Sequence, residues 1–92
     1  MDAERLHGVV HGDVQGVGFR WFLMRKATQL GLRGWVRNRD DGTVEFVAEG
    51  RRSELEQLRR AAEHGPAMAR VARVDDDWSP AAGGLDDFDL TG

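Results

Sequence analysis

Apolar and polar positions divide the first half of the chain into four elements. Residues 5–12 predict a short strand in which Leu6 and Val10 face the core. From residue 21 to residue 30, apolar side chains recur on one face at helical spacing, and Gly31 follows as a typical helix end. Residues 34–38 and 43–49 then predict the two strands of a hairpin, because an Asp-Gly pair, a common turn signal, lies between them.

A second helix and two more strands are predicted in the second half. The helix begins at Ser53, because Ser53 and Glu56 have the spacing of a capping box and leucines follow at helical intervals. Residues 70–77 form a further strand, and residues 88–90 form a short last strand. This βαββαβ order with a short C-terminal strand predicts an α+β, ferredoxin-like two-layer sandwich, with two helices on one face of an antiparallel sheet. The chain length predicts a single domain over residues 1–92.

Composition and charge exclude several kinds of chemistry and argue against several kinds of partner. The chain has no cysteine, which excludes thiolate chemistry, disulfides and cysteine-ligated metals. Its net charge of −3 argues against a general affinity for nucleic acid or anionic membranes, which attract basic surfaces. Nothing near Met1 resembles a signal peptide, and no apolar run reaches membrane-spanning length. We therefore expect a cytoplasmic protein that binds neither nucleic acid nor membrane, and that binds any anion at a local site.

The segment 12–20 departs from the usual start of a helix. No Ser, Thr, Asp or Asn lies just before the predicted helix, and no acidic residue occupies its first turn. A cation, Arg20, stands there instead, although the helix dipole makes this position unfavourable by up to about 1 kcal/mol. An anion beside Arg20 would remove that cost and would accept hydrogen bonds from the leading N–H groups. The segment therefore predicts an anion-binding site.

Glycine spacing makes phosphate the anion that this loop favours. Gly16 and Gly18 permit conformations in which successive N–H groups converge on one point, and the fork of Arg20 adds donors of fixed geometry. On these residues alone a second interpretation stays open, in which the glycines form a tight turn and Arg20 is a surface residue. The loop has neither the Gly-Lys-Ser/Thr ending of a Walker loop nor the third glycine of a dinucleotide-binding fingerprint.

Two longer motifs match a known family. The sequence VHGDVQGVGFR at residues 10–20 resembles the first acylphosphatase signature, and GWVRNRDDGTVEFVAEG at residues 34–50 resembles the second. The resemblance implies a metal-free enzyme without cofactors that has a ferredoxin-like fold and hydrolyses acyl phosphates to a carboxylate and inorganic phosphate. It assigns phosphate binding to Arg20 and the positioning of water to Asn38. On spacing alone, Asn38 is better explained as a turn residue.

The other expected site residues accompany these two assignments. Thr43 is near enough in sequence to support Asn38, although its position also suits an ordinary strand residue. Phosphate is expected to bind the main-chain N–H groups of Gln15, Gly16, Val17, Gly18 and Phe19 together with the Arg20 side chain.

Water is the expected nucleophile. The chain lacks cysteine and tyrosine, and its two serines and three histidines show no triad pattern, so a covalent intermediate is not expected. His7 and His11 share a strand face, but no third ligand has suitable spacing for a metal. The alternatives are an RNA binder, a phosphate-sensing regulatory domain, or the acylphosphatase-like module of large carbamoyl-transfer maturation proteins. Among these, the chain length favours a free-standing enzyme. We expect it to be a monomer, although no residue pattern specifies the oligomeric state.

Overall fold

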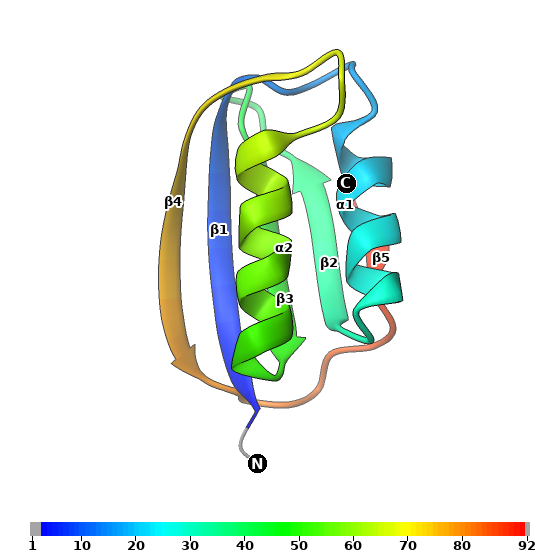
Figure 1. Cartoon of the computed structure of the whole chain (residues 1–92), viewed down its shortest axis with the longest axis vertical. Helices are drawn as coiled ribbons and strands as arrows, with labels where there is room; N and C mark the ends of the chain where they lie inside the picture. Colours follow the sequence, from blue (N-terminus) through cyan, green and yellow to red (C-terminus); the bar gives the residue numbers. More distant parts are fainter. Residues whose placement is uncertain (1–2, 92) are drawn as a thin grey trace.

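Five strands and two helices follow one another in the predicted order in the computed structural model, which describes residues 3–91 (Figure 1). The elements are β1 Glu4–Asp13, α1 Phe19–Gln29, β2 Arg33–Asn38, β3 Val44–Gly50, α2 Arg52–His64, β4 Arg70–Pro80 and β5 Asp89–Thr91. The two helices lie side by side on one face of the sheet (Figure 1). This arrangement confirms the predicted α+β two-layer sandwich.

The sheet has the strand order β4-β1-β3-β2-β5. β1 pairs antiparallel with β3 and β4, and β2 pairs antiparallel with β3, so four strands form the antiparallel sheet that was predicted. β5 instead pairs in parallel with β2, where Leu90 lies opposite Val36. The segment after β4 crosses one end of the sheet to reach the free edge of β2, and β5 then runs in the same direction as β2 (Figure 1). The complete sheet is therefore mixed.

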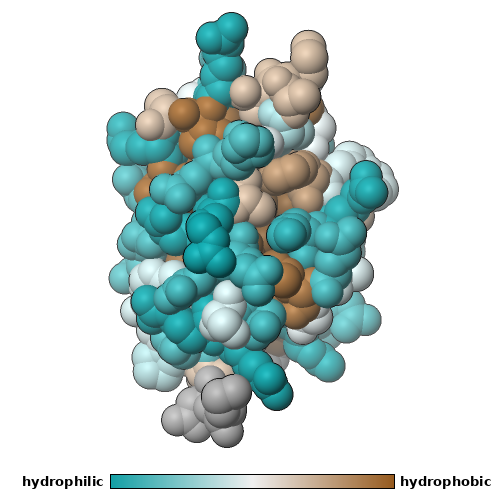
Figure 2. Space-filling view, in the orientation of Figure 1, coloured by the Kyte–Doolittle hydropathy of each residue, from teal (hydrophilic) through white to brown (hydrophobic). Residues whose placement is uncertain are grey.

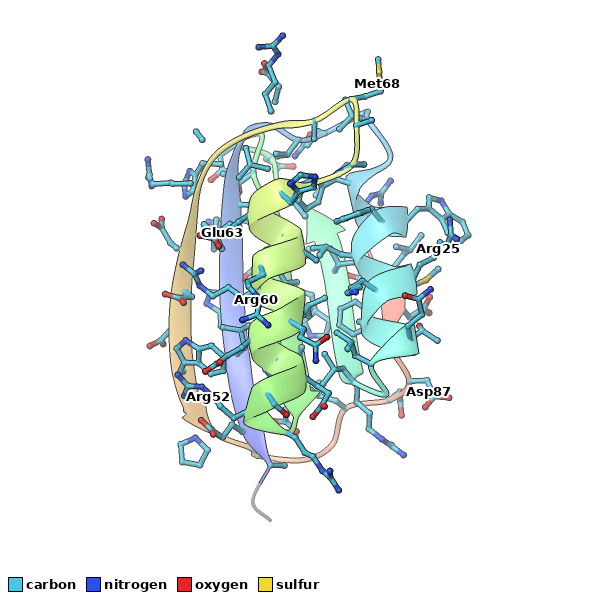
Figure 3. All side chains as sticks on the ribbon, in the orientation of Figure 1. Arg25, Arg52, Arg60, Glu63, Met68 and Asp87 are labelled. Carbon is cyan, nitrogen blue, oxygen red and sulfur yellow. The ribbon has the colours of Figure 1, made fainter. Side chains whose placement is uncertain are left out.

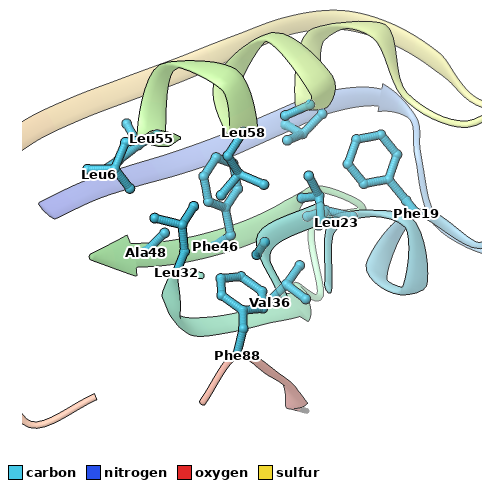
Figure 4. Packing of buried hydrophobic residues seen from close by; sticks show 14 of the residues in the cluster. Leu6, Phe19, Leu23, Leu32, Val36, Phe46, Ala48, Leu55, Leu58 and Phe88 are labelled. Carbon is cyan, nitrogen blue, oxygen red and sulfur yellow. The ribbon is translucent and has the colours of Figure 1, made fainter. Parts of the chain in front are cut away.

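The hydrophobic core fills the space between the helices and the sheet. Phe46 is fully buried, and Figure 4 shows Leu58 of α2 beside its ring. Gly8 lies opposite Phe46 in the β1–β3 ladder, where an added Cβ would lie 2.4 Å from ring atoms, so glycine makes room for the ring. Hydrophilic residues dominate the outer surface of the helical layer (Figure 2). α1 contributes three buried residues at intervals of four, Phe19, Leu23 and Ala27.

The predicted end of α1 is confirmed. Gly31 has a φ of +71°, and its N–H donates to the Thr28 carbonyl oxygen at 3.1 Å. The N–H of Leu32 donates to the Ala27 carbonyl oxygen at 2.9 Å, which completes a Schellman motif. Leu32 and Ala27 are both buried, so the motif is fixed in the core. β2 begins at the next residue, Arg33.

The predicted capping box at the start of α2 is wrong. The helix begins at Arg52, one residue before Ser53, and its N-terminus has no side-chain cap. The Ser53 hydroxyl donates to the Glu54 carboxylate, while Glu56 accepts a hydrogen bond of 2.9 Å from Arg52. The Glu56 carboxylate therefore binds the Arg52 side chain one turn earlier and does not cap a main-chain N–H group at the helix start.

Glu49 of β3 binds the segment between β4 and β5 through hydrogen bonds. Its carboxylate is buried to 8% exposure and accepts hydrogen bonds from Arg5 Nε at 2.7 Å and from the N–H groups of Ala82 and Gly83 at 2.8 and 3.2 Å. Burial opposes ionisation of Glu49, but these three donors outweigh it and hold the pKa of Glu49 below its ordinary value.

This lowered pKa predicts a pH dependence of stability. A carboxylate with a lowered folded-state pKa stabilises the fold above its unfolded-state pKa, and that contribution is lost as the pH falls through the folded-state value. We expect Glu49→Gln to lower the free energy of unfolding by about 1–3 kcal/mol at neutral pH. Urea unfolding of both proteins at several pH values measures the difference, which should vanish in acid. A constant difference at all pH values would contradict this account of Glu49.

Candidate active site

The glycine-bearing loop lies between β1 and α1, at the end of the sandwich drawn uppermost in Figure 1. Val14 and Phe19 flank it with side chains that are 1% and 2% exposed, so both ends of the loop are fixed in the core. Gly16 and Gly18 have φ values of +74° and +79°, in the left-handed region that glycine adopts without strain. The loop therefore has the glycine-dependent conformation that its sequence predicted.

The start of α1 offers many donors and no protein acceptor for them within residues 3–91. Gly18 is the N-cap and provides no side-chain hydrogen bond, and the first turn contains no acidic residue. The main-chain N–H groups of residues 15–21 have no acceptor among the described residues. Arg20 is partly exposed and likewise makes no ion pair or side-chain hydrogen bond within them. The loop thus concentrates positive charge and unpaired donors at one place, as an anion site requires.

The β2–β3 hairpin determines the position of Asn38, the last residue of β2. The Gly42 N–H donates to the Arg39 carbonyl oxygen at 3.1 Å, and the Arg39 N–H donates to the Thr43 carbonyl oxygen at 2.9 Å. Asp41 accepts two further hydrogen bonds, from the Thr43 N–H at 3.0 Å and the Thr43 hydroxyl at 2.6 Å. These two donors lower the pKa of Asp41. The turn is therefore held by its own hydrogen bonds, and Thr43 belongs to the framework that carries Asn38.

A shallow cleft of about 380 Å³ lies beside this hairpin and is lined by Arg37, Asn38, Arg39, Asp40 and Asp41. Asn38 is partly exposed there, and its side chain makes no hydrogen bond with residues 3–91. Arg20 is not among the lining residues. Arg37 pairs with Glu45 and Arg39 pairs with Asp41, at 2.7 and 3.6 Å, so these two cations are already neutralised.

Gln15 joins the loop to the hairpin. Its side-chain Nε2 donates to the carbonyl oxygen of Arg39 at 2.7 Å and to that of Thr43 at 2.9 Å. The loop that leads to Arg20 and the hairpin that carries Asn38 therefore lie against each other at one end of the molecule. Sequence reasoning considered the main-chain N–H of Gln15 and missed this contact of its side chain.

Metal-ligating side chains do not gather near the loop or elsewhere in the described chain. His7 Nε2 contacts Glu45 Oε2 at 2.7 Å, and His11 Nε2 contacts Asp75 Oδ2 at 2.9 Å. Within residues 3–91, no group of three or more His, Cys, Asp or Glu side chains is arranged to hold a metal ion. No helix in that part of the chain is long and apolar enough to cross a membrane.

Several acylphosphatases are similar to this chain along nearly its full length. The family model for acylphosphatase matches residues 6–90. An acylphosphatase of Thermococcus kodakarensis is 48% identical over 92 residues, which cover 100% of both chains. One of Cupriavidus pinatubonensis is 52% identical over 87 residues, 95% of this chain and 94% of that one. The crystal structure of acylphosphatase from Bacillus subtilis superposes with a TM-score of 0.93 at 36% identity, covering 97% of this chain and 99% of that one.

The fold and these similarities define a small hydrolase with a ferredoxin-like architecture. The chain belongs to the acylphosphatase family, and its activity is the hydrolysis of acyl phosphates.

Proposed function

We propose that the loop of residues 15–19 and Arg20 bind the phosphoryl group of an acyl phosphate, while Asn38 positions the attacking water. The observation that carries this proposal is the run of N–H groups without a protein acceptor beside an unpaired Arg20, within residues 3–91. Each charge-assisted hydrogen bond to phosphate contributes about 1.5–3 kcal/mol, so several together are sufficient for a specific site.

The chemistry of the substrate explains why so few residues are needed. An acyl phosphate is a mixed anhydride, and its leaving group is a carboxylate, which departs without help from a strong general acid. The protein therefore acts by positioning the reactants and by stabilising charge on the phosphoryl oxygens. Arg20 and the loop N–H groups supply that stabilisation, because they are preorganised donors that face a developing negative charge.

Asn38 is suited to water because it is neutral and carries both an acceptor and donors. Its oxygen accepts a hydrogen bond from the water, and a charged residue in its place would repel or trap the anionic substrate. The water oxygen forms a bond to phosphorus, and the bond from phosphorus to the acyl oxygen breaks. Because Asn is a poor base, the proton of the water passes to a phosphoryl oxygen and leaves with inorganic phosphate.

Hydrolysis of benzoyl phosphate in the presence of a metal chelator tests this proposal. We expect full activity with the chelator, because the proposed mechanism uses only side chains and main-chain N–H groups. A profile of rate against pH should show no essential base of the enzyme near neutrality. Loss of activity with chelator, or a pH dependence that requires such a base, would contradict the mechanism.

A further inference from the structure

The Gln15 side chain makes a contact between the loop before α1 and the β2–β3 hairpin. Both hydrogens of its side-chain amide are used, one for the Arg39 carbonyl oxygen and one for the Thr43 carbonyl oxygen. These carbonyl groups come directly after Asn38 and directly before β3, so they bracket the turn. Among residues 3–91, no other side-chain hydrogen bond connects residues 14–20 with residues 38–43.

The hairpin does not need Gln15 in order to form. Its turn is closed by two main-chain hydrogen bonds and by both hydrogen bonds from Thr43 to Asp41. The strands on either side continue in a regular ladder from Asn38 opposite Val44 to Arg33 opposite Glu49. What Gln15 adds is a link of defined length between this self-sufficient hairpin and the loop before α1.

We propose that Gln15 is a positioning residue that sets the distance between the bound phosphoryl group and the water held by Asn38. The inference rests on the proposed function, since it requires phosphate at Arg20 and water at Asn38. Catalysis by positioning is sensitive to small displacements, and a shift of about 1 Å can lower a rate about 10²-fold. The side chain of Gln15 thus controls turnover without touching the substrate.

Gln15→Met tests this inference because methionine has a similar length and no N–H donor. We expect kcat to fall by about 10²-fold, while KM and the inhibition constant of inorganic phosphate change by less than about threefold. Gln29→Met is the matched control, because Gln29 is exposed at the far end of α1, and its kinetics should equal those of the wild type. An unchanged kcat in Gln15→Met, or an equal loss of phosphate affinity, would overturn the inference.

A double-mutant cycle with Asn38→Ala separates positioning from general destabilisation. If Gln15 acts through the water at Asn38, then Gln15→Met should lower kcat no further in a protein that already carries Asn38→Ala. If Gln15→Met lowered kcat by the same factor in both backgrounds, Gln15 would act independently of Asn38. That result would overturn this inference and leave the proposed function intact. Wild-type turnover in Asn38→Ala by itself would instead refute the proposed function.

Gln15→Glu provides a second variant that does not depend on how methionine packs. At neutral pH its carboxylate faces two carbonyl oxygens and cannot donate, whereas the protonated acid can donate one hydrogen bond. The kcat of this variant should therefore rise, relative to the wild type, as the pH is lowered. A constant ratio of the two kcat values across pH would count against a positioning role.

Discussion

Arg20→Ala is expected to lower turnover by about 10³–10⁵-fold, because loss of a guanidinium from a developing phosphoryl charge has this order of effect in phosphoryl transfer. Affinity for inorganic phosphate should fall as well, since Arg20 is the one side-chain cation that the sequence places in this helix turn. Steady-state hydrolysis of benzoyl phosphate gives the first quantity, and competitive inhibition by phosphate gives the second.

Two further variants show whether the effect of Arg20→Ala is due to the position and the guanidinium group of Arg20. Arg25→Ala removes an exposed arginine that projects from the same helix into solvent, and its activity should be close to that of the wild type (Figure 3). Arg20→Lys keeps the charge and loses the planar fork, so it should recover part of the phosphate affinity and little of the turnover. Near-normal turnover in Arg20→Ala would mean that phosphate binds elsewhere.

Asn38→Ala is expected to lower kcat by at least about 10²-fold, because the water would no longer be held in line with the leaving group. Its affinity for inorganic phosphate should remain that of the wild type, since the donors proposed to bind phosphate belong to residues 15–20 and not to the hairpin. This division between kcat and phosphate affinity distinguishes Asn38 from Arg20, whose removal should reduce both. Rapid-mixing turnover and phosphate inhibition measure the two quantities.

Gln57→Ala is a suitable control for Asn38→Ala, because it removes another partly buried side-chain amide, in the middle of α2. Urea unfolding of both variants shows whether a loss of activity reflects a loss of stability. Unchanged kcat in a folded Asn38→Ala protein would remove Asn38 from the mechanism.

Local patterns predicted most of the fold, and they were least accurate at element boundaries. α1 begins at Phe19 rather than at residue 21, because Phe19 extends the buried stripe of Leu23 and Ala27 by one turn. β4 continues to Pro80 because it pairs with β1 along nearly the whole length of β1. Such limits depend on the partner element, and a local pattern does not contain that information.

The parallel direction of β5 could not be predicted from its own residues. The strand has three residues, and its pairing depends on β2, more than fifty positions earlier in the chain. Phe88, which is 7% exposed in the core, is the residue that indicates a buried segment there. An apolar residue among Asp86, Asp87 and Asp89 is a signal of burial, but it does not specify direction.

The candidate site was predictable only where its features are local in the sequence. An uncapped helix start with Arg20 in its first turn is a local feature, and it predicted the unpaired donors that the structure contains between residues 15 and 21. The side-chain contacts of Gln15 are not local. Their acceptors are main-chain carbonyl oxygens 24 and 28 residues away, and every residue has such a group, so no residue type marks them.

The most direct test of the proposed mechanism is hydrolysis of benzoyl phosphate by the purified protein in ¹⁸O-labelled water with a metal chelator present. Attack of the water held by Asn38 on phosphorus predicts one labelled oxygen in the phosphate product, none in the benzoate, and a rate that the chelator does not change. Label in the benzoate would mean attack at the carbonyl carbon, and inhibition by the chelator would mean that a metal takes part. Either result would contradict the proposed mechanism.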